Sequence, residues 1–249
     1  MNRLGVLLLL WLTGARVPPA PEPPLKLPIL MYHRIRDPPP GETGTPADVS
    51  CPRELFRAHL DFLGAQGYTT VTFVDVRAFL EGRAMPPAKP IVLSFDDGDA
   101  NHWDAFLDLR GRGMKGVFFV ITKLLGDGAH LSADQLRTMA GAGMEIGSHS
   151  VTHWDLKDLK PSEKEREILG SKADLDALLG APVISFCYPG GNYDRASLDI
   201  LGRSGYWFAR TTKPGVSVVL GRDFELKTIP IFRGTTPKRL AAKLETRGR

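Results

Sequence analysis

Two short stretches of this 249-residue sequence carry residue types that could do chemistry together. Residues 94–98 read Ser-Phe-Asp-Asp-Gly, and residues 149–153 read His-Ser-Val-Thr-His. Two histidines four apart share one face of a helix or tight turn, a spacing common among metal ligands. One carboxylate with two imidazoles leaves an open position on Zn²⁺ or a similar ion, as in catalytic sites. The other carboxylate could then act as a general base on a metal-activated water.

Each stretch also has a plainer interpretation when it is taken alone. An Asp-Asp-Gly sequence is typical of a solvated turn, and a histidine pair at this spacing is often incidental. Two carboxylates can instead flank a glycosidic bond, which requires a separation of about 5 Å or more that sequence neighbours can reach. The spacing therefore leaves a glycoside hydrolase open as an alternative.

The segments that precede these residues decide whether they can meet. The apolar run at 91–93, after a Pro-Ala-Lys-Pro breaker, predicts a buried strand. Neighbouring residues of a strand point to opposite faces, so Asp96 and Asp97 can face one ligand only if the chain turns. Gly98 permits that turn. Residues 144–148 predict a second strand, which would deliver His149 and His153 to the same rim.

A third stretch, residues 186–191, reads Phe-Cys-Tyr-Pro-Gly-Gly. Pro189 fixes φ, and Gly190 and Gly191 leave backbone N–H groups accessible at a strand end. Such a turn can point an amide at a developing oxyanion, although alone it is an ordinary Pro-Gly turn.

Strand patterns alternate with helical patterns along the whole chain. This alternation favours an α/β fold in a single domain, with one parallel sheet closed or nearly closed into a barrel. We expect strands at residues 27–35, 69–73, 91–95, 116–122, 144–148, 183–188, 206–211 and 227–232. We expect helices at residues 52–66, 74–80, 101–112, 132 onward, 161–179, 194–203 and 237–244.

The N-terminus has the features of a secretory signal: a basic start, an apolar core from Leu4 to Leu12, and the small residues Thr13 and Ala15. We therefore divide the chain into a signal peptide at 1–15, a Pro-rich spacer at 16–26 and a catalytic domain at 27–249. An uncleaved anchor is the alternative. This division predicts an exported protein, in the extracellular space, the periplasm or the cell envelope. No later stretch is long and apolar enough to span a bilayer.

Composition excludes some classes of protein. The chain is 43% hydrophobic and 24% charged, with a net charge of +4. It has no Lys/Arg cluster interleaved with aromatic residues, so the sequence gives no support for nucleic-acid binding. Only Cys51 and Cys187 could form a disulfide, and we expect two free, buried thiols instead.

Together the three stretches resemble motifs one to three of the polysaccharide deacetylases, carbohydrate esterase family 4. Residues 109–120 and 205–212 resemble the flanking segments, so the likeness runs from about residue 27 to 232. The resemblance implies a distorted (β/α)₇ barrel. It also implies Asp96 as the base, Asp97, His149 and His153 as metal ligands, and an oxyanion turn.

That turn comprises Tyr188, Pro189, Gly190 and Gly191, with the Gly190 N–H nearest the oxyanion. The ligand set implies Zn²⁺, with Co²⁺, Ni²⁺ or Fe²⁺ as alternatives.

Two features depart from the family pattern. Many members have an arginine where Cys187 stands, and many use a histidine in a C-terminal Leu-x-His motif as general acid, whereas residues 225–228 here read Glu-Leu-Lys-Thr. Residues 28–34 instead resemble the exported poly-N-acetylglucosamine deacetylase branch, in which this N-terminal histidine takes the acid position. We therefore predict His33 as the general acid, with a purely structural histidine as the alternative.

The expected activity is metal-dependent removal of N-acetyl groups from an N-acetylglucosamine-containing polysaccharide, with release of acetate. The alternatives are an inactive carbohydrate-binding relative, a glycoside hydrolase on a similar barrel, and an amidase or esterase of small substrates. The aromatic residues Tyr188, Trp154 and Trp207 could line a sugar groove. We expect His59, His102 and His130 at the surface.

Overall fold

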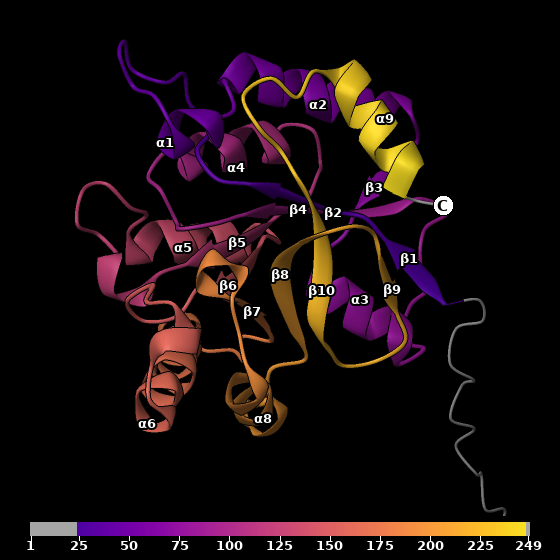
Figure 1. Ribbon diagram of the computed structural model, residues 1–249. Helices are drawn as coiled ribbons and strands as arrows, with labels where there is room; N and C mark the ends of the chain where they lie inside the picture. The colour runs from indigo at the N-terminus through magenta and orange to yellow at the C-terminus, as the bar shows by residue number, and fades with distance from the viewer. Residues whose placement is uncertain (1–23, 248–249) are drawn as a thin grey trace, which may run out of the picture.

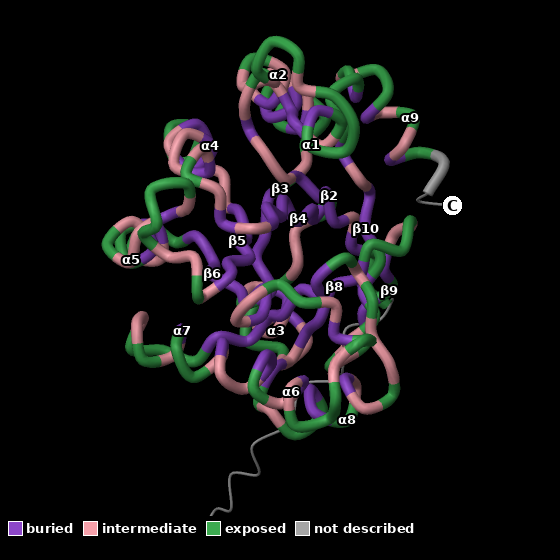
Figure 2. Tube along the Cα trace, turned by 60° about the vertical axis from the view of Figure 1, so that its left-hand side comes forward, coloured by how far each residue is buried: buried purple, intermediate pink, exposed green. Residues whose placement is uncertain are grey.

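The strands at the centre of the molecule are short apolar runs, as expected for a parallel sheet covered by helices. In the computed structural model, which describes residues 24–247, every residue of β4 (Pro90–Phe95) and β5 (Val117–Val120) is buried. Figure 2 shows the buried segments at the centre and the exposed ones on the surrounding helices and loops.

Within the described residues, seven parallel strands close into a ring. Their order is β2, β10, β8, β7, β6, β5 and β4, and β4 pairs with β2 to complete the circle. The other five strands are β2 (Ile29–Tyr32), β6 (Glu145–Ser148), β7 (Ser185–Cys187), β8 (Phe208–Pro214) and β10 (Asp223–Pro230). Register shifts between β8 and β10 distort the ring. The distorted (β/α)₇ barrel and the single α/β domain are therefore confirmed.

Three short strands lie outside the ring. β3 (Thr69–Thr70) extends the sheet beside β4, and β1 (Leu25–Leu27) pairs antiparallel with β9 (Ser217–Val219). The β1–β9 pair was not predicted, because each strand is only three residues long.

Helices surround the barrel, and α2 packs against both α4 and α9 (Figure 1). The α-helices are α1 (Thr45–Asp48), α2 (Arg53–Ala65), α3 (Phe73–Leu80), α4 (His102–Arg110), α5 (Ala133–Gly141), α6 (Pro161–Glu165), α7 (Ser171–Leu179), α8 (Arg195–Ser204) and α9 (Pro237–Arg247). Short 3₁₀ turns occur at Thr122–Leu124, Leu156–Asp158 and Pro189–Gly191. The helix predicted from residue 132 onward is α5, and it begins with a capping box formed by Ser132 and Gln135.

The helix predicted at 161–179 contains an irregularity. A π-helical segment, Arg166–Gly170, joins α6 to α7. Such π turns are rare and are often found at functional sites.

The predicted signal peptide, residues 1–15, lies outside the described residues and stays a prediction. The predicted spacer, residues 16–26, lies mostly outside them too, and its last two residues belong to β1. Among residues 24–247, no helix is both long enough and apolar enough to cross a bilayer.

Candidate active site

The carboxyl end of β4 carries the two aspartates. Phe95, the last residue of the strand, stacks between Tyr32 and Phe118 at ring distances of 5.3 and 4.6 Å. The chain then turns at Asp97 itself, which has φ 77°, and continues through Gly98 at φ 78°. A side chain at Gly98 would press on Val120, so this turn requires glycine. The early turn brings both carboxylates to the same end of the barrel.

The carboxyl end of β6 carries the two histidines in a tight turn. Ser150 and His153 have positive φ values of 66° and 67°, and the Ser150 Oγ accepts a hydrogen bond from the His153 N–H at 3.0 Å. The Glu167 carboxylate accepts three further bonds from the turn: from the Val151 and Thr152 N–H groups and from the Thr152 hydroxyl, at 3.0, 2.8 and 2.7 Å. Glu167 belongs to the π-helical segment, so that irregular turn supports the histidine loop.

Asp97, His149 and His153 form one cluster whose potential ligand atoms all lie within 4.8 Å of one another. The Asp97 Oδ1 is 3.4 Å from the His149 Nε2 and 3.6 Å from the His153 Nε2. The His149 Nδ1 donates to the Cys187 carbonyl at 2.8 Å, which leaves the Nε2 of this ring facing Asp97. This set suits a divalent cation that accepts nitrogen and oxygen ligands. Burial raises the pKa of Asp97, but the adjacent imidazoles outweigh it and hold this pKa below its usual value.

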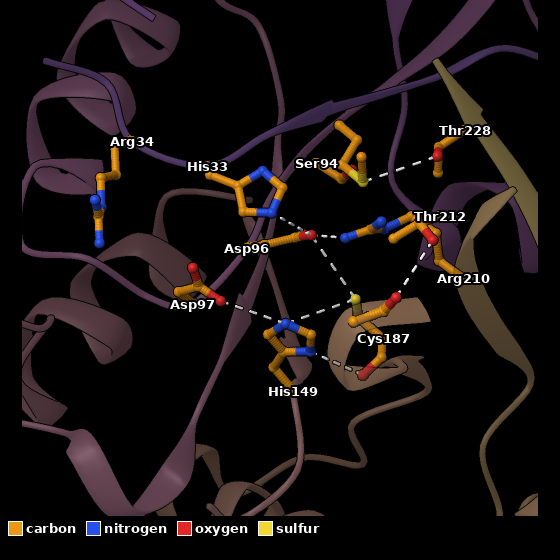
Figure 3. A network of polar contacts seen from close by, with 12 residues as sticks. His33, Arg34, Ser94, Asp96, Asp97, His149, Cys187, Arg210, Thr212 and Thr228 are labelled. Carbon is orange, nitrogen blue, oxygen red and sulfur yellow. Dashed lines mark hydrogen bonds and ion pairs between the residues drawn. The ribbon is translucent and has the colours of Figure 1, made fainter. Parts of the chain in front are cut away.

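Asp96 occupies the centre of a buried polar network (Figure 3). One of its oxygens pairs with the guanidinium of Arg210 from β8, and the other lies 3.7 Å from the His33 Nε2 and 3.9 Å from the Cys187 Sγ. Asp96 and Arg210 are 2% and 0% exposed, so this ion pair is shielded from water. Burial raises the pKa of Asp96, yet Arg210 and His33 together hold it below its usual value. Asp96 is therefore a carboxylate at neutral pH.

His33 follows β2 and is fixed through its backbone. The His102 Nε2 donates to the His33 carbonyl at 2.5 Å, and the Asn101 Oδ1 accepts from the Ile35 N–H at 2.8 Å. Both partners stand at the start of α4, directly after the aspartate turn. The His33 side chain is 23% exposed, and its ring faces Asp96 in Figure 3.

The turn after β7 completes the site. The N–H groups of Gly191 and Asn192 donate to the carbonyls of Tyr188 and Pro189, so the Gly190 N–H is the one not used inside the turn. Gly190 has φ 62°, and a side chain at Gly191 would lie 2.1 Å from the Thr212 Oγ1. Both positions therefore require glycine.

The two aspartates, the two histidines of the turn, His33 and Gly190 all line one cavity of about 250 Å³. The residues that line it are His33, Arg34, Thr45, Pro46, Val49, Asp96, Asp97, His149, His153, Tyr188, Gly190 and Thr212. Of the predicted site residues, Pro189 and Gly191 are outside this lining, although both belong to the same turn as Gly190.

Several residues were missed or misplaced by sequence reasoning. Arg210 lies in the segment 205–212 that resembles a family flanking segment, and Glu167 lies in the helix predicted at 161–179, but neither was predicted to be at the site. Nothing in the sequence shows that a distant strand and a π turn bring them to the site. His59 and His102 were expected at the surface, which is wrong: both are fully buried, the first bonded to Tyr32 and to the Thr235 carbonyl.

Trp207 and the two cysteines are not among the residues that line the cavity. Trp207 lies under the Arg77 guanidinium of α3, 4.1 Å from the ring centre, at the amino end of β8, so it does not line the cavity. Cys51 and Cys187 are free and buried, as predicted. Burial raises the pKa of Cys187, which keeps the thiol neutral beside Asp96.

Comparisons with known proteins agree with this geometry. A sequence model described as polysaccharide deacetylase matches residues 83–209. The Bacillus subtilis (strain 168) protein YxkH, a polysaccharide deacetylase by its name, is 32% identical over 226 residues, which are 90% of this chain and 78% of that protein.

Two solved structures extend the comparison to the fold. The Streptococcus pyogenes deacetylase PplD, in complex with acetate, has a TM-score of 0.81 and 31% identity, covering 88% of this chain and 98% of its own. The polysaccharide deacetylase BC0361 from Bacillus cereus has a TM-score of 0.79 and 29% identity, covering 89% of this chain and 69% of its own. With its barrel, its clustered aspartates and histidines, and these relatives, the chain belongs to the polysaccharide deacetylase family.

Proposed function

We propose that this protein is a metal-dependent N-deacetylase that hydrolyses acetamide groups of an N-acetylglucosamine-containing polysaccharide and releases acetate. The observation that carries the proposal is the meeting of two groups in one cavity. The three-residue ligand cluster lines this cavity, and so does Asp96, which is held between Arg210 and His33.

Asp97, His149 and His153 would hold the cation, with Zn²⁺ as the first candidate and Co²⁺, Ni²⁺ or Fe²⁺ as alternatives. A bound cation of this kind supplies Lewis acidity toward the acetyl carbonyl and the attacking water. The hydrogen bond from His149 to the Cys187 carbonyl keeps the Nε2 of His149 available as a ligand atom.

Asp96 is the proposed general base. Its carboxylate is ionised because Arg210 stabilises the negative charge, and one of its oxygens remains directed toward the cavity side that His33 occupies. It would accept a proton from the attacking water as the new C–O bond forms. Because Arg210 binds Asp96 Oδ1, the carboxylate cannot rotate freely, and Oδ2 stays on the side of His33.

His33 is the proposed general acid. Its Nε2 points into the cavity near Asp96, and its backbone is held by His102. When the tetrahedral intermediate breaks its C–N bond, protonated His33 would donate its proton to the departing amine. The Gly190 N–H would donate to the oxyanion formed from the acetyl oxygen.

The type of glycan and the location are part of the proposal. The family relationship supports a polysaccharide substrate, and the deacetylase PplD is known in complex with acetate, the product expected here. The likeness of residues 28–34 to the exported poly-N-acetylglucosamine deacetylases and the signal-like N-terminus support an exported enzyme that acts on such a glycan.

One assay tests the function: acetate release from N-acetylglucosamine oligomers, after treatment with a chelator and again after addition of Zn²⁺ or Co²⁺. We expect activity only with metal. Release of reducing sugar without metal dependence would identify a glycoside hydrolase, and metal-bound protein without any turnover would identify an inactive relative.

Site variants separate the roles. Asp97→Ala and His149→Ala should lose metal binding and activity together, whereas Asp96→Asn should still bind the metal but lose turnover by a factor of about 10² to 10⁴. Full activity of Asp96→Asn would refute the assignment of the base.

A further inference from the structure

A second cavity adjoins the active site on the other side of the histidine turn. It has a volume of about 330 Å³ and is lined by Thr152, Trp154, Leu159, Glu163, Arg166 and Glu167. The two cavities share one short segment, because His153 lines the catalytic cavity while Thr152 and Trp154 line the second. A ligand longer than one sugar unit could therefore reach from one cavity into the other.

Trp154 gives the second cavity a large, exposed aromatic side chain. Its side chain is 64% exposed, although an indole gains more from burial than almost any other side chain. Its position is nonetheless fixed on both sides. The preceding His153 N–H is bonded to Ser150, and the Asp155 carboxylate that follows accepts from the Asn192 Nδ2 at 2.6 Å. The indole is thus an exposed, flat, apolar surface next to a predicted metal ligand, and the residues on both sides of it in the chain are held by hydrogen bonds.

Of the charged side chains that line the second cavity, Arg166 is the one available to bind a ligand. Glu167 is engaged by the histidine turn, and Glu163 accepts from the Lys160 N–H at 2.8 Å. Arg166 is exposed, and among residues 24–247 no hydrogen bond or ion pair occupies its guanidinium. The cavity therefore combines an aromatic plane with free N–H donors, which is the combination that recognises a sugar ring and its hydroxyl or carbonyl oxygens.

We propose that the second cavity is a glycan subsite, in which a neighbouring sugar of the substrate chain lies flat on Trp154 and accepts hydrogen bonds from Arg166. The inference rests on the proposed function. The catalytic cavity, at about 250 Å³, is smaller than the roughly 300 Å³ at which pockets for drug-sized ligands begin. A polysaccharide must then continue outside it, and the C–H face of a pyranose is apolar enough to cover an indole.

Kinetics with substrates of different length test this subsite. For Trp154→Ala, we expect KM for the N-acetylglucosamine tetramer to rise about 10-fold, as the loss of one aromatic contact would cause. The kcat, and the hydrolysis of a small acetyl ester that reaches only the catalytic cavity, should not change. Arg166→Gln should raise KM for the tetramer several-fold. Leu220→Ala, which removes another exposed apolar side chain elsewhere, is the matched control and should change nothing.

Direct binding provides a second readout that does not depend on turnover. The chain has four tryptophans, and of those in the described residues Trp154 is the exposed one. The tetramer should shift the tryptophan emission of chelator-treated wild-type protein and leave that of Trp154→Phe unchanged.

An unchanged KM for the tetramer in Trp154→Ala would overturn the subsite. Equal losses on the tetramer and on the small ester would also overturn it, because Trp154 would then only position His153. The outcomes also distinguish failure of the subsite from failure of the proposed function. If the tetramer binds through Trp154 but no acetate is released, the proposed deacetylase activity is refuted. If acetate is released but Trp154→Ala has the same KM for the tetramer as wild type, only the subsite is refuted.

Discussion

The chemistry of Asp96 depends most strongly on one side chain from another strand, Arg210 of β8. A carboxylate that is 2% exposed would be expected to take up a proton, because burial disfavours its charge. Arg210, together with His33, reverses this effect, and Arg210 also fixes which oxygen faces the cavity. Since Cys187 stands where many family members have an arginine, Arg210 supplies from β8 the positive charge that the neighbouring strand lacks.

Replacing Arg210 with methionine should leave metal affinity nearly unchanged and lower kcat by about 10²-fold or more, because the proposed base loses its orientation. The variant should also be less stable by about 3–5 kcal/mol, since the charge of Asp96 would be left buried and unpaired. Metal titration, kcat and denaturant unfolding measure the three effects. Arg210→Lys, which keeps the charge, is the control and should retain more activity; equal activity of the Met variant and wild type would contradict this account.

The role of His33 can be tested through the leaving group. His33→Gln should lower kcat for N-acetylglucosamine oligomers by about 10²-fold or more, because the departing amine needs a proton. Hydrolysis of p-nitrophenyl acetate should be much less affected, since its leaving group departs without protonation. Parallel losses on both substrates would indicate that His33 is a structural histidine.

At the scale of elements, the π-helical segment between α6 and α7 stabilises the turn that carries His149 and His153. The histidine turn contains two non-glycine residues with positive φ, and such strained residues persist only when their surroundings hold them. Glu167 provides three of the bonds that do so, and it is placed there by the π-helical segment between α6 and α7. A regular helix would rotate the following residues away from their present contacts.

We therefore expect Glu167→Ala to weaken metal affinity by about 10- to 100-fold, the usual effect of losing an outer-shell partner. Thr152→Val, which removes one of the three bonds, should have a smaller effect. Glu165→Ala, an exposed neighbour on the same helix, is the control. A competition titration with a chromophoric chelator gives the affinities, and identical affinities for wild type and Glu167→Ala would show that the turn is held without this carboxylate.

At the scale of the whole molecule, the two ends of the barrel differ in chemistry. The carboxyl ends of β2, β4, β6 and β7 lead into the site. At the amino end of β6, Glu145 is buried and accepts from the Val74 N–H and the Ser185 hydroxyl at 3.0 and 2.5 Å. Burial raises the pKa of Glu145 from 4.5 to about 7. This end therefore joins α3 to the sheet through a group that favours its neutral form.

The raised pKa of Glu145 predicts how stability depends on pH. Between pH 4.5 and 7 the unfolded chain loses this proton while the folded chain keeps it, so stability should fall as pH rises through that window. The loss should be on the order of 3 kcal/mol. Glu145→Gln keeps both hydrogen bonds without the charge, so its free energy of unfolding should exceed that of wild type at pH 8 and match it near pH 4.5. Denaturant unfolding at both pH values measures this; parallel pH profiles would contradict it.

Much of this architecture can be predicted from local sequence patterns. The buried strands were found because apolar runs such as 91–93 and 117–120 are bounded by breakers, and α5 because Ser132 and Gln135 form a capping box. The β1–β9 pair could not be found, since three residues carry too little periodicity. The burial of His59 and His102 could not be predicted either, because it depends on bonds to residues that are distant in sequence.

The alternation of strand and helix patterns in the sequence determined the barrel class. The sequence also determined the aspartate pair, the histidine pair and the glycine turn, because each of these lies within a few residues of a strand end. Only the tertiary structure decided that Arg210 faces Asp96, that Glu167 supports the histidine turn and that Trp154 borders a second cavity. Those contacts join side chains up to 114 residues apart. Closure of the ring, rather than any local pattern, brings such residues together.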